Sequence, residues 1–571
     1  MYDALIRGGE LVDGTGRARR RADLGILNGR IAAIGTDLGE ALHVMDASGR
    51  IVSPGFVDIH SHFDAQVFWD TALTPSSLYG VTTTISGNCG FTLAPLSADA
   101  LDYLVRMLAI VEGMPLESLR ACIDGDWSST AELLDRVDGT LAINLGFLVG
   151  HSAIRRVTMG KAATRRSATG EERTAMDGLL RAGLEAGGLG FSSSWSPSHL
   201  DGDGDPVPST FADASELIDL ASVCRDFDGT SLEFIPKRVD RFDAEQLDLL
   251  LAMSARAERA LNWNVIRVTA SNGAETERVL SAGHRAGAEG ARIVALAMPI
   301  ASRAHFSFAT GFVLNALPGW RETFSLPIPA RIEALRSTRV RRELEEGARR
   351  AQGPLGEMAD WSNRVISQTF DPGLEHYAGR SVSEIAKEEG KSTFDALLDI
   401  ACADELRTTF TRPPSDPSRD DWKAFAAAVR EAHAVIGASD AGAHLDFIAY
   451  YDYPAYLLER GVREHGVFSL EEAIHLMTEV PARLYGLRDR GTLEVGSHAD
   501  VVVFDADEIA SGRLETRFDL PSGAGRLYSE PRGVDRVLVN GEEIVREGVL
   551  TNARPGTLLR SGRDTTTPST A

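Results

Sequence analysis

The chain lacks the features that would place it in a membrane, on nucleic acid or among disulfide-bonded proteins. No run of about 18 or more apolar residues occurs, so no bilayer-spanning helix is expected. Only four cysteines are spread over 571 residues, too few for a disulfide framework. Positive charge is scarce, with 59 Lys and Arg against 82 Asp and Glu and a net charge of −23. Such a surface repels phosphate backbones and anionic lipids, so neither nucleic acid nor a membrane is an expected partner.

The N-terminal residues also lack a secretion signal. MYDALIRGGELVDGTG has no basic segment followed by an apolar core, which argues against a signal peptide. Together with the few scattered cysteines, this predicts a cytoplasmic protein. A length of 571 residues exceeds one simple domain and predicts several domains or one large barrel with additions. A homo-oligomer is the default expectation for a chain of this kind.

The two ends of the chain share a β-rich texture. Residues 1–54 and 486–555 consist of short alternating apolar runs separated by Gly, Asp and Asn-Gly turns, which are typical of hairpins. We therefore expect one small β-sandwich domain built from both ends. The remaining C-terminal residues, 556–571, are polar and rich in Thr, and are expected to form a loose tail.

The middle of the chain alternates short apolar runs with helical patterns. This alternation is the signature of parallel βα units and predicts a TIM-like (β/α)₈ barrel, an α/β fold, over residues 55–485. About 135 residues separate the last two strands, too many for a loop, so an insertion is expected at about 300–432 between barrel strands 7 and 8. It includes a charged helix at 329–352. The eight expected strands are 55–60, 81–87, 141–150, 188–193, 230–235, 261–268, 291–298 and 434–439.

The first strand ends in Asp-Ile-His-Ser-His. Residues two apart in a strand point to the same side, so His60 and His62 present two imidazoles together at the end of the barrel that carries active sites. Neutral imidazole is a good ligand for zinc and similar metals. A surface or core histidine pair is the alternative, but the preceding Pro-Gly and apolar run favour metal binding.

Two further residues could act on the same metal. Asp440 follows the last strand, the neighbour of the first strand in a closed barrel, and could bind the metal or accept a proton from water. Its alternative role is a helix N-cap. Cys89 follows the second strand in a Gly- and Asn-rich loop, where a thiolate could bind zinc or a small buried side chain could simply pack. His151 and His444, after strands three and eight, could contact substrate, and a structural role for His151 is equally open.

Taken in order, several segments resemble the amidohydrolase superfamily, and within it the N-acyl-D-amino-acid deacylase (D-aminoacylase) branch. They are LIRGGELVDGTG, IVSPGFVDIHSHFD, GVTTTISGNCGFTLAPL, VGHSAIRRVTMG, ASDAGAH and GTLEVGSHADVVVFD. The resemblance implies a zinc-dependent hydrolase, with one or two metal ions, of a linear amide C–N bond in an N-acyl-D-amino acid or a related small N-acylated substrate. It further implies that His60, His62, Cys89 and Asp440 bind metal and that Asp440 is the general base and acid for metal-activated water.

The fifth to seventh strands depart from the family pattern. Glu233 and Asn264 stand nearest the places where the family has metal-binding histidines. Glu233 is accordingly expected as a further metal ligand, whereas Asn264, Arg267 and Arg303 are expected to contact substrate. A single metal ion, an ion held differently and a lost metal site remain alternatives. So do hydrolysis of a cyclic amide or lactone and a catalytically inactive structural homologue.

Overall fold

The centre of the protein is a set of parallel β-strands. The computed structural model describes residues 1–299, 304–310, 313–413 and 415–569. One hydrogen-bonded sheet has the strand order β26-β10-β9-β8 and another the order β11-β12-β13-β14-β15-β19. Each of the eight segments expected to be a strand contains at least one, and 141–150 contains two. The strands are β8 (Phe56–Asp58), β9 (Val81–Ser86), β10 (Asn144–Phe147), β11 (Val149–Gly150), β12 (Gly190–Ser194), β13 (Ser231–Ile235), β14 (Leu261–Ile266), β15 (Ile293–Ala297), β19 (Ala434–Ile436) and β26 (Leu558–Leu559).

These two sheets are connected at both ends. Only Leu148 separates β10 from β11, so one stretch of chain takes part in both sheets. At the other end, the chain beyond β8 meets the chain beyond β19, where Ser61 and Ala441 form a parallel bridge. The amide of Asp440 also donates to the carbonyl of His60 at 3.2 Å. The first and last central strands therefore end side by side.

Helices follow most of the central strands, as in an α/β fold. Their starts are set locally: at α6 the hydroxyl of Thr169 accepts from the amide of Glu172, whose carboxylate accepts from the amide of Thr169. The apolar faces of most of them join the central strands in one large core, whereas the helices over 101–122 pack in a separate apolar cluster. The helices are α1 (Phe63–Gln66), α2 (Leu101–Val111), α3 (Leu116–Cys122), α4 (Thr130–Val137), α5 (His151–Met159), α6 (Gly170–Glu185), α7 (Ala214–Val223), α8 (Ala244–Ala257), α9 (Gly273–Ala288), α16 (Arg419–Arg430), α17 (Tyr453–Tyr456), α18 (Leu470–Met477) and α19 (Glu479–Leu484).

The two ends of the chain meet in a seven-stranded sheet. Its order is β25-β24-β23-β20-β7-β2-β3, and the pairing of β7 with β20 joins the N-terminal part to the C-terminal part. A four-stranded sheet, β5-β4-β1-β6, contributes to the same apolar cluster. The strands are β1 (Tyr2–Arg7), β2 (Glu10–Leu11), β3 (Arg20–Arg21), β4 (Asp23–Leu27), β5 (Arg30–Gly35), β6 (Ala41–Asp46), β7 (Ile51–Pro54), β20 (Val501–Phe504), β23 (Val534–Val539), β24 (Glu542–Arg546) and β25 (Val549–Leu550).

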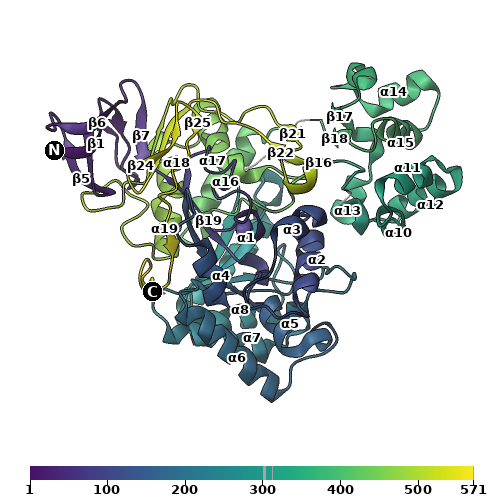
Figure 1. Ribbon diagram of the computed structural model, residues 1–571, viewed down its shortest axis with the longest axis horizontal. Coiled ribbons are helices and arrows are strands. Elements are labelled where there is room, and N and C mark those ends of the chain that lie inside the picture. Colours follow the sequence, from purple (N-terminus) through teal and green to yellow (C-terminus); the bar gives the residue numbers. More distant parts are fainter. Residues whose placement is uncertain (300–303, 311–312, 414, 570–571) are drawn as a thin grey trace.

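Between β15 and β19 the chain forms a mostly helical segment with its own core. Aromatic side chains such as Trp320, Trp361 and Phe410 make up much of that core, and Figure 1 shows the segment extending on the side opposite the N-terminal strands. The charged helix expected at 329–352 is instead two helices, because Ser337 adopts an extended conformation between them. The elements are β16 (His305–Phe306), α10 (Arg321–Phe324), α11 (Ile328–Arg336), α12 (Thr338–Arg349), α13 (Gly353–Met358), β17 (Val365–Gln368), α14 (Val382–Glu389), α15 (Thr393–Ala403) and β18 (Thr409–Thr411).

Of the C-terminal residues expected to be a loose tail, those over 556–569, which the structure describes, are held by packing and hydrogen bonds. Leu558 and Leu559 are fully buried, and their strand β26 pairs with β10. Farther on, the hydroxyl of Thr565 donates to the carbonyl of Gly229 at 2.7 Å. The prediction was wrong because it relied on polar composition and overlooked the Leu-Leu pair. Among the described residues, none of the helices combines the length and the apolarity needed to cross a bilayer.

Candidate metal centre

The two histidines after β8 point into one buried site. His60 is fully buried and His62 is 2% exposed, and their rings meet edge to face with centroids 5.2 Å apart. Side-chain bonds between the first and last strands fix the chain here. The hydroxyl of Ser439 donates to the carboxylate of Asp58, which also accepts from the amide of His60. The strand end that carries both imidazoles is therefore held against the strand that leads to Asp440.

Cys89 approaches both imidazoles from the loop after β9. Its Sγ lies 3.6 Å from Nε2 of His60 and 3.9 Å from Nε2 of His62. The loop turns sharply, with Cys89 in the left-handed region at φ 58° between Gly87 at 78° and Gly90 at 79°. A side chain at position 87 would lie 2.5 Å from a backbone oxygen, so glycine is required there. A cysteine held in a costly conformation and aimed at two imidazoles indicates a functional site.

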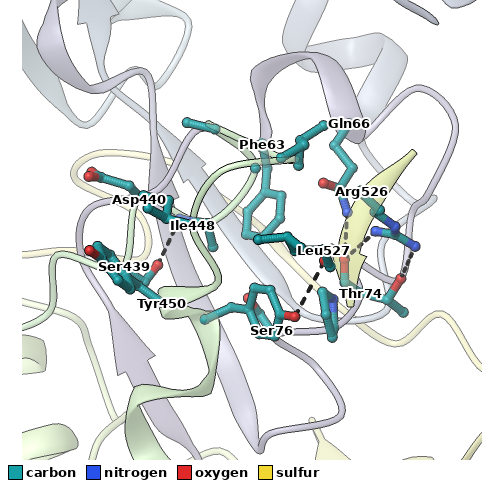
Figure 2. A pocket seen from close by; sticks show the side chains of 16 residues that line it. Phe63, Gln66, Thr74, Ser76, Ser439, Asp440, Ile448, Tyr450, Arg526 and Leu527 are labelled. Atoms are coloured by element: carbon teal, nitrogen blue, oxygen red, sulfur yellow. Dashed lines mark hydrogen bonds between the residues drawn. The ribbon is translucent and has the colours of Figure 1, made fainter. Parts of the chain in front are cut away.

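Asp440 lies beside the two imidazoles, on the more exposed side of the site. Its Oδ1 lies 3.3 Å from Nε2 of His60 and 3.8 Å from Nε2 of His62. Its side chain is 27% exposed, whereas the side chain of His60 is fully buried. Asp440 also lines a pocket, and Figure 2 shows it with Ser439 on one side of Phe63, across from Gln66 and Arg526. We call His60, His62, Cys89 and Asp440 the metal cluster.

Burial controls the charge of these side chains. It lowers the pKa of His60 to about 3 and that of His62 well below its usual value, so both imidazoles are neutral, as a metal requires. Burial, with Asp58 nearby, raises the pKa of Asp440 to about 7. Burial and the acidic groups Glu233, Glu112 and Asp440 raise the pKa of the Cys89 thiol. A bound divalent cation would favour the anionic forms of these acids.

Glu233, expected as a further metal ligand, faces the other edge of the His60 ring. Its Oε1 lies 3.9 Å from Nδ1 of His60, and its Oε2 accepts the amide of Cys89 at 2.8 Å. Glu233 therefore lies next to His60 and Cys89. It does not face the Nε2 atoms, toward which Cys89 and Asp440 point. Asn264 does reach the Nε2 edge, because its Nδ2 donates to Nε2 of His60 at 3.0 Å.

Two further residues near the cluster, Glu112 and Tyr450, are not among those that the sequence pattern indicated. Glu112, the C-cap of α2, places Oε1 3.4 Å from Nδ1 of His62. Tyr450 lines the pocket beside Asp440, and burial, together with the Asp440 charge, raises its pKa to about 12. Glu112 lies at the end of an amphipathic helix and carries no motif. Tyr450 belongs to the run Tyr-Tyr-Asp-Tyr eleven residues after the last expected strand, and that aromatic run was the available signal.

The remaining expected residues are distributed differently. His444 lies within electrostatic range of His62 and donates its amide to the carbonyl of Glu112. Arg267 is exposed beyond β14, where its charge opposes the rise in the pKa of Tyr450. Arg303 lies outside the described residues.

His151 is not brought to the metal cluster. Its Nδ1 pairs with the hydroxyl of Ser193 at 2.8 Å and its Nε2 with Glu216 at 2.9 Å. Glu216 also accepts from the buried guanidinium of Arg155. Since both ring nitrogens are engaged, these contacts favour the structural alternative over a substrate contact. We call His151, Arg155, Ser193 and Glu216 the arginine cluster.

The metal cluster fits a divalent ion. Among the described residues, His60, His62 and Cys89 are the only group of three or more His, Cys, Asp or Glu with ligand atoms all within 4.8 Å of one another. Nitrogen and sulfur ligands of this kind, with a carboxylate beside them, suit zinc. Asp440 is the partly exposed member of the cluster, so the group is accessible from that side, as in a catalytic rather than a structural site. Fold and cluster together define a metal-dependent hydrolase.

The chain belongs to the amidohydrolase family, whose model matches residues 43–545. It is 31% identical to an uncharacterized protein of Mycobacterium tuberculosis, over 98% of this chain and 96% of that one. It is 29% identical to N-acyl-D-glutamate deacylase of Alcaligenes xylosoxydans xylosoxydans, again over 98% and 96%. The crystal structure of N-acyl-D-glutamate deacylase from Bordetella bronchiseptica, complexed with zinc and a phosphonate mimic of the tetrahedral intermediate, matches with a TM-score of 0.65. That match has 26% identity and covers 98% of this chain and all of the other.

Proposed function

We propose that the protein hydrolyses the amide bond of an N-acyl-D-amino acid. The observation that carries the proposal is the convergence of His60, His62 and Cys89 in a buried group that only Asp440 connects to a pocket. Relatives aligned over nearly the whole chain are named N-acyl-D-glutamate and N-acyl-D-aspartate deacylase, which supports an N-acyl-D-amino acid as the substrate class. Zinc in the Bordetella bronchiseptica enzyme supports zinc as the metal.

His60, His62, Cys89 and Asp440 would hold the zinc ion. When bound, zinc supplies Lewis acidity, which polarises a carbonyl and lowers the pKa of water. The carboxylate of Asp440 accepts the proton of the attacking water, because it alone of the four side chains faces the pocket. The same carboxylate then delivers that proton to the leaving nitrogen, since an amide nitrogen departs as an amine only after protonation. The neighbouring apolar walls, including Phe63, exclude bulk water.

Three of the expected substrate contacts remain part of the proposal. Asn264 touches His60 and can reach a substrate carbonyl bound at the same edge. His444 lies beside His62, and Arg267 lies at the rim with its guanidinium exposed to pair with the substrate carboxylate. We add Tyr450, whose place in the pocket suits a hydrogen bond to the substrate.

The proposed architecture closes the eight parallel strands into one barrel over residues 55–485, with the site at the carboxyl ends of its strands. The bridge between Ser61 and Ala441 supports closure. Residues 1–54 and 486–555 would form one β-sandwich domain, and about 300–432 an insertion. The four free cysteines support a reducing compartment such as the cytoplasm. A homo-oligomer also remains a prediction, which light scattering can check.

The test is a substrate screen with the zinc-loaded protein. Matched N-acetyl-D- and N-acetyl-L-amino acids with acidic, apolar and neutral polar side chains are compared with a hydantoin and a lactone, and amine release is followed. Faster hydrolysis of the D-acyl compounds is expected. Turnover of the cyclic amide or lactone alone would overturn the proposal in favour of those substrates. Failure of every compound in the presence of bound zinc would remove N-acyl-amino acids as the substrate class.

A further inference from the structure

Each histidine of the metal cluster has a buried carboxylate behind it. Oε1 of Glu112 lies 3.4 Å from Nδ1 of His62, and Oε1 of Glu233 lies 3.9 Å from Nδ1 of His60. The side chain of Glu233 is fully buried and that of Glu112 is 4% exposed. The two pairs are thus alike although Glu112 comes from the end of α2 and Glu233 from β13.

Unpaired polar atoms mark the same contacts. Among the described residues, Nδ1 of His60, Nδ1 of His62 and Oε1 of Glu233 are buried without a hydrogen-bond partner. Leaving a buried donor or acceptor unpaired costs about 1–3 kcal/mol. A carboxylate oxygen faces each imidazole Nδ1, at 3.4 Å for Glu112 and at 3.9 Å for Glu233. If each imidazole carries its proton on Nδ1, a shift of a few tenths of an ångström to about one ångström brings each pair within hydrogen-bond distance.

That tautomer is the one a metal at Nε2 requires. An imidazole that binds a metal through one nitrogen commonly donates the other N–H to a carboxylate, which fixes the ring and strengthens it as a ligand. We propose that Glu112 and Glu233 are positioning residues that orient His62 and His60 in this way, and that the site holds a single divalent ion. The inference rests on the metal centre of the proposed function.

The single-ion part follows from how Glu233 is used. Its Oε2 accepts the Cys89 amide and its Oε1 lies 3.9 Å from Nδ1 of His60, so Glu233 is directed at these two groups rather than at a second set of metal ligands. Asn264 offers only a neutral amide, a weak ligand. Within the described residues, no other group of three His, Cys, Asp or Glu brings its ligand atoms within 4.8 Å. A second ion would therefore lack a ligand set.

The decisive measurement is metal content. The full-length protein is loaded with zinc, dialysed, and analysed by inductively coupled plasma mass spectrometry. One tightly bound zinc per chain is expected, and two would overturn the single-ion assignment without any variant. Competition with a chromophoric chelator then gives the affinity. Glu233→Gln and Glu112→Gln should each keep one ion and weaken its binding by on the order of 10- to 100-fold.

Controls separate positioning from folding. Glu216→Gln alters a buried glutamate that faces a histidine outside the metal cluster, and its zinc affinity should match the wild type. Circular dichroism reports folding, and Glu233→Asp replaces Glu233→Gln if the latter does not fold. In cobalt-loaded protein, the thiolate-to-cobalt band should persist in both glutamine variants, because Cys89 stays a ligand. Unchanged affinity in both variants would overturn the positioning role.

The readouts distinguish this inference from the proposed function. A protein that binds one zinc with the expected variant effects, yet hydrolyses no N-acyl amino acid, would refute the substrate and leave the metal arrangement standing. A protein that hydrolyses these compounds with two zinc ions bound would support the proposed substrate and refute the single-ion assignment.

Discussion

The metal cluster and the arginine cluster are built from similar residues and behave differently. Both combine buried histidine with buried carboxylate. In the arginine cluster, Arg155 supplies a cation to Glu216, and His151 has a partner on each nitrogen. In the metal cluster, neither Asp440 nor the adjoining Glu112 and Glu233 forms an ion pair with Lys or Arg among the described residues. Their ion-pair contacts are all with histidine.

The difference teaches where a functional site lies. Buried carboxylates are stable when a cation compensates them, and a cluster that carries its own guanidinium is complete. In a cluster of acids and neutral imidazoles without one, burial raises the pKa of the acids, and an external cation can supply the missing positive charge. Counting the cations inside each cluster therefore separates the site from the structural network, although both contain the histidine and carboxylate that mark active sites.

The largest effect is expected from a substitution that removes the catalytic group of the metal cluster but preserves its structure. Asp440→Asn removes the group that moves the proton, so kcat should fall by on the order of 10²- to 10⁴-fold. The variant should still fold and still contain zinc, because His60, His62 and Cys89 remain. Steady-state hydrolysis of the best acyl-amino acid, with zinc content measured in parallel, is the check. Asp446→Asn, in the same loop, is the control and should keep its activity. Near-normal kcat in Asp440→Asn would exclude the proposed base.

Removing zinc should affect the two clusters unequally. An ion that binds only the folded state stabilises it by about 4 kcal/mol when present at a thousand times its Kd. Chelated wild-type protein should therefore melt at a lower temperature than zinc-loaded protein. In Cys89→Ser the difference should shrink, because thiolate is the stronger ligand. In Ser193→Ala, a change in the arginine cluster, the zinc-dependent difference should match the wild type. Equal melting of loaded and chelated wild type would contradict the metal cluster.

A substitution in the arginine cluster should lower the stability of the protein and leave its zinc binding unchanged. Glu216→Ala leaves the buried guanidinium of Arg155 without its carboxylate, a defect that typically costs about 3–5 kcal/mol. Urea unfolding should show this loss, whereas zinc content and KM should stay at wild-type values in the folded protein. A Glu216→Ala variant that loses zinc would show that the two clusters are not independent.

Much of the fold and the four residues of the metal cluster could be predicted because they leave local patterns in the sequence. The eight central strands are short apolar runs, and His60 with His62 follows the first in a spacing that a strand presents on one side. Cys89 and Asp440 follow strands that end at the same edge. These signals lie within a few residues of the side chain concerned.

The rest depends on contacts between distant segments. Glu112 reaches His62 from the end of α2, and nothing near Glu112 in the sequence indicates that. His151 follows a strand, like the metal ligands, but Ser193 and Glu216 occupy its nitrogens from other strands and helices. Glu233 lies on the expected strand, but its contacts with the Cys89 amide and the His60 ring come from two other segments of the chain. The packed C-terminus was missed because two leucines suffice to dock a polar segment.

Acid should weaken the arginine cluster in a defined pH window. Burial alone would raise the pKa of Glu216, but the hydrogen bond and charge of His151 and the charge of Arg155 hold it at about 2, below the ordinary value of 4.5. A depressed carboxylate pKa contributes stability that is present above pH 4.5 and lost as the pH falls toward 2. Glu216→Gln lacks this contribution. The stability gap between wild type and Glu216→Gln in urea should be constant near neutral pH and narrow below pH 4.5. A stability difference that increases in acid would contradict a lowered pKa of Glu216.

The smallest expected effect tests whether the arginine cluster is structural throughout. Ser193→Ala removes the hydroxyl that pairs with Nδ1 of His151 and leaves that nitrogen buried without its partner, a defect that costs about 1–3 kcal/mol. The loss should be smaller than in Glu216→Ala, because no charge is left uncompensated. Ser192, its neighbour in β12, serves as the comparison, since its hydroxyl accepts from the amide of Gly90 in the loop that carries Cys89. Ser192→Ala should therefore weaken zinc binding, whereas Ser193→Ala should lower stability alone. If both variants change zinc affinity equally, Ser193 also influences the metal cluster, and the two clusters are not independent.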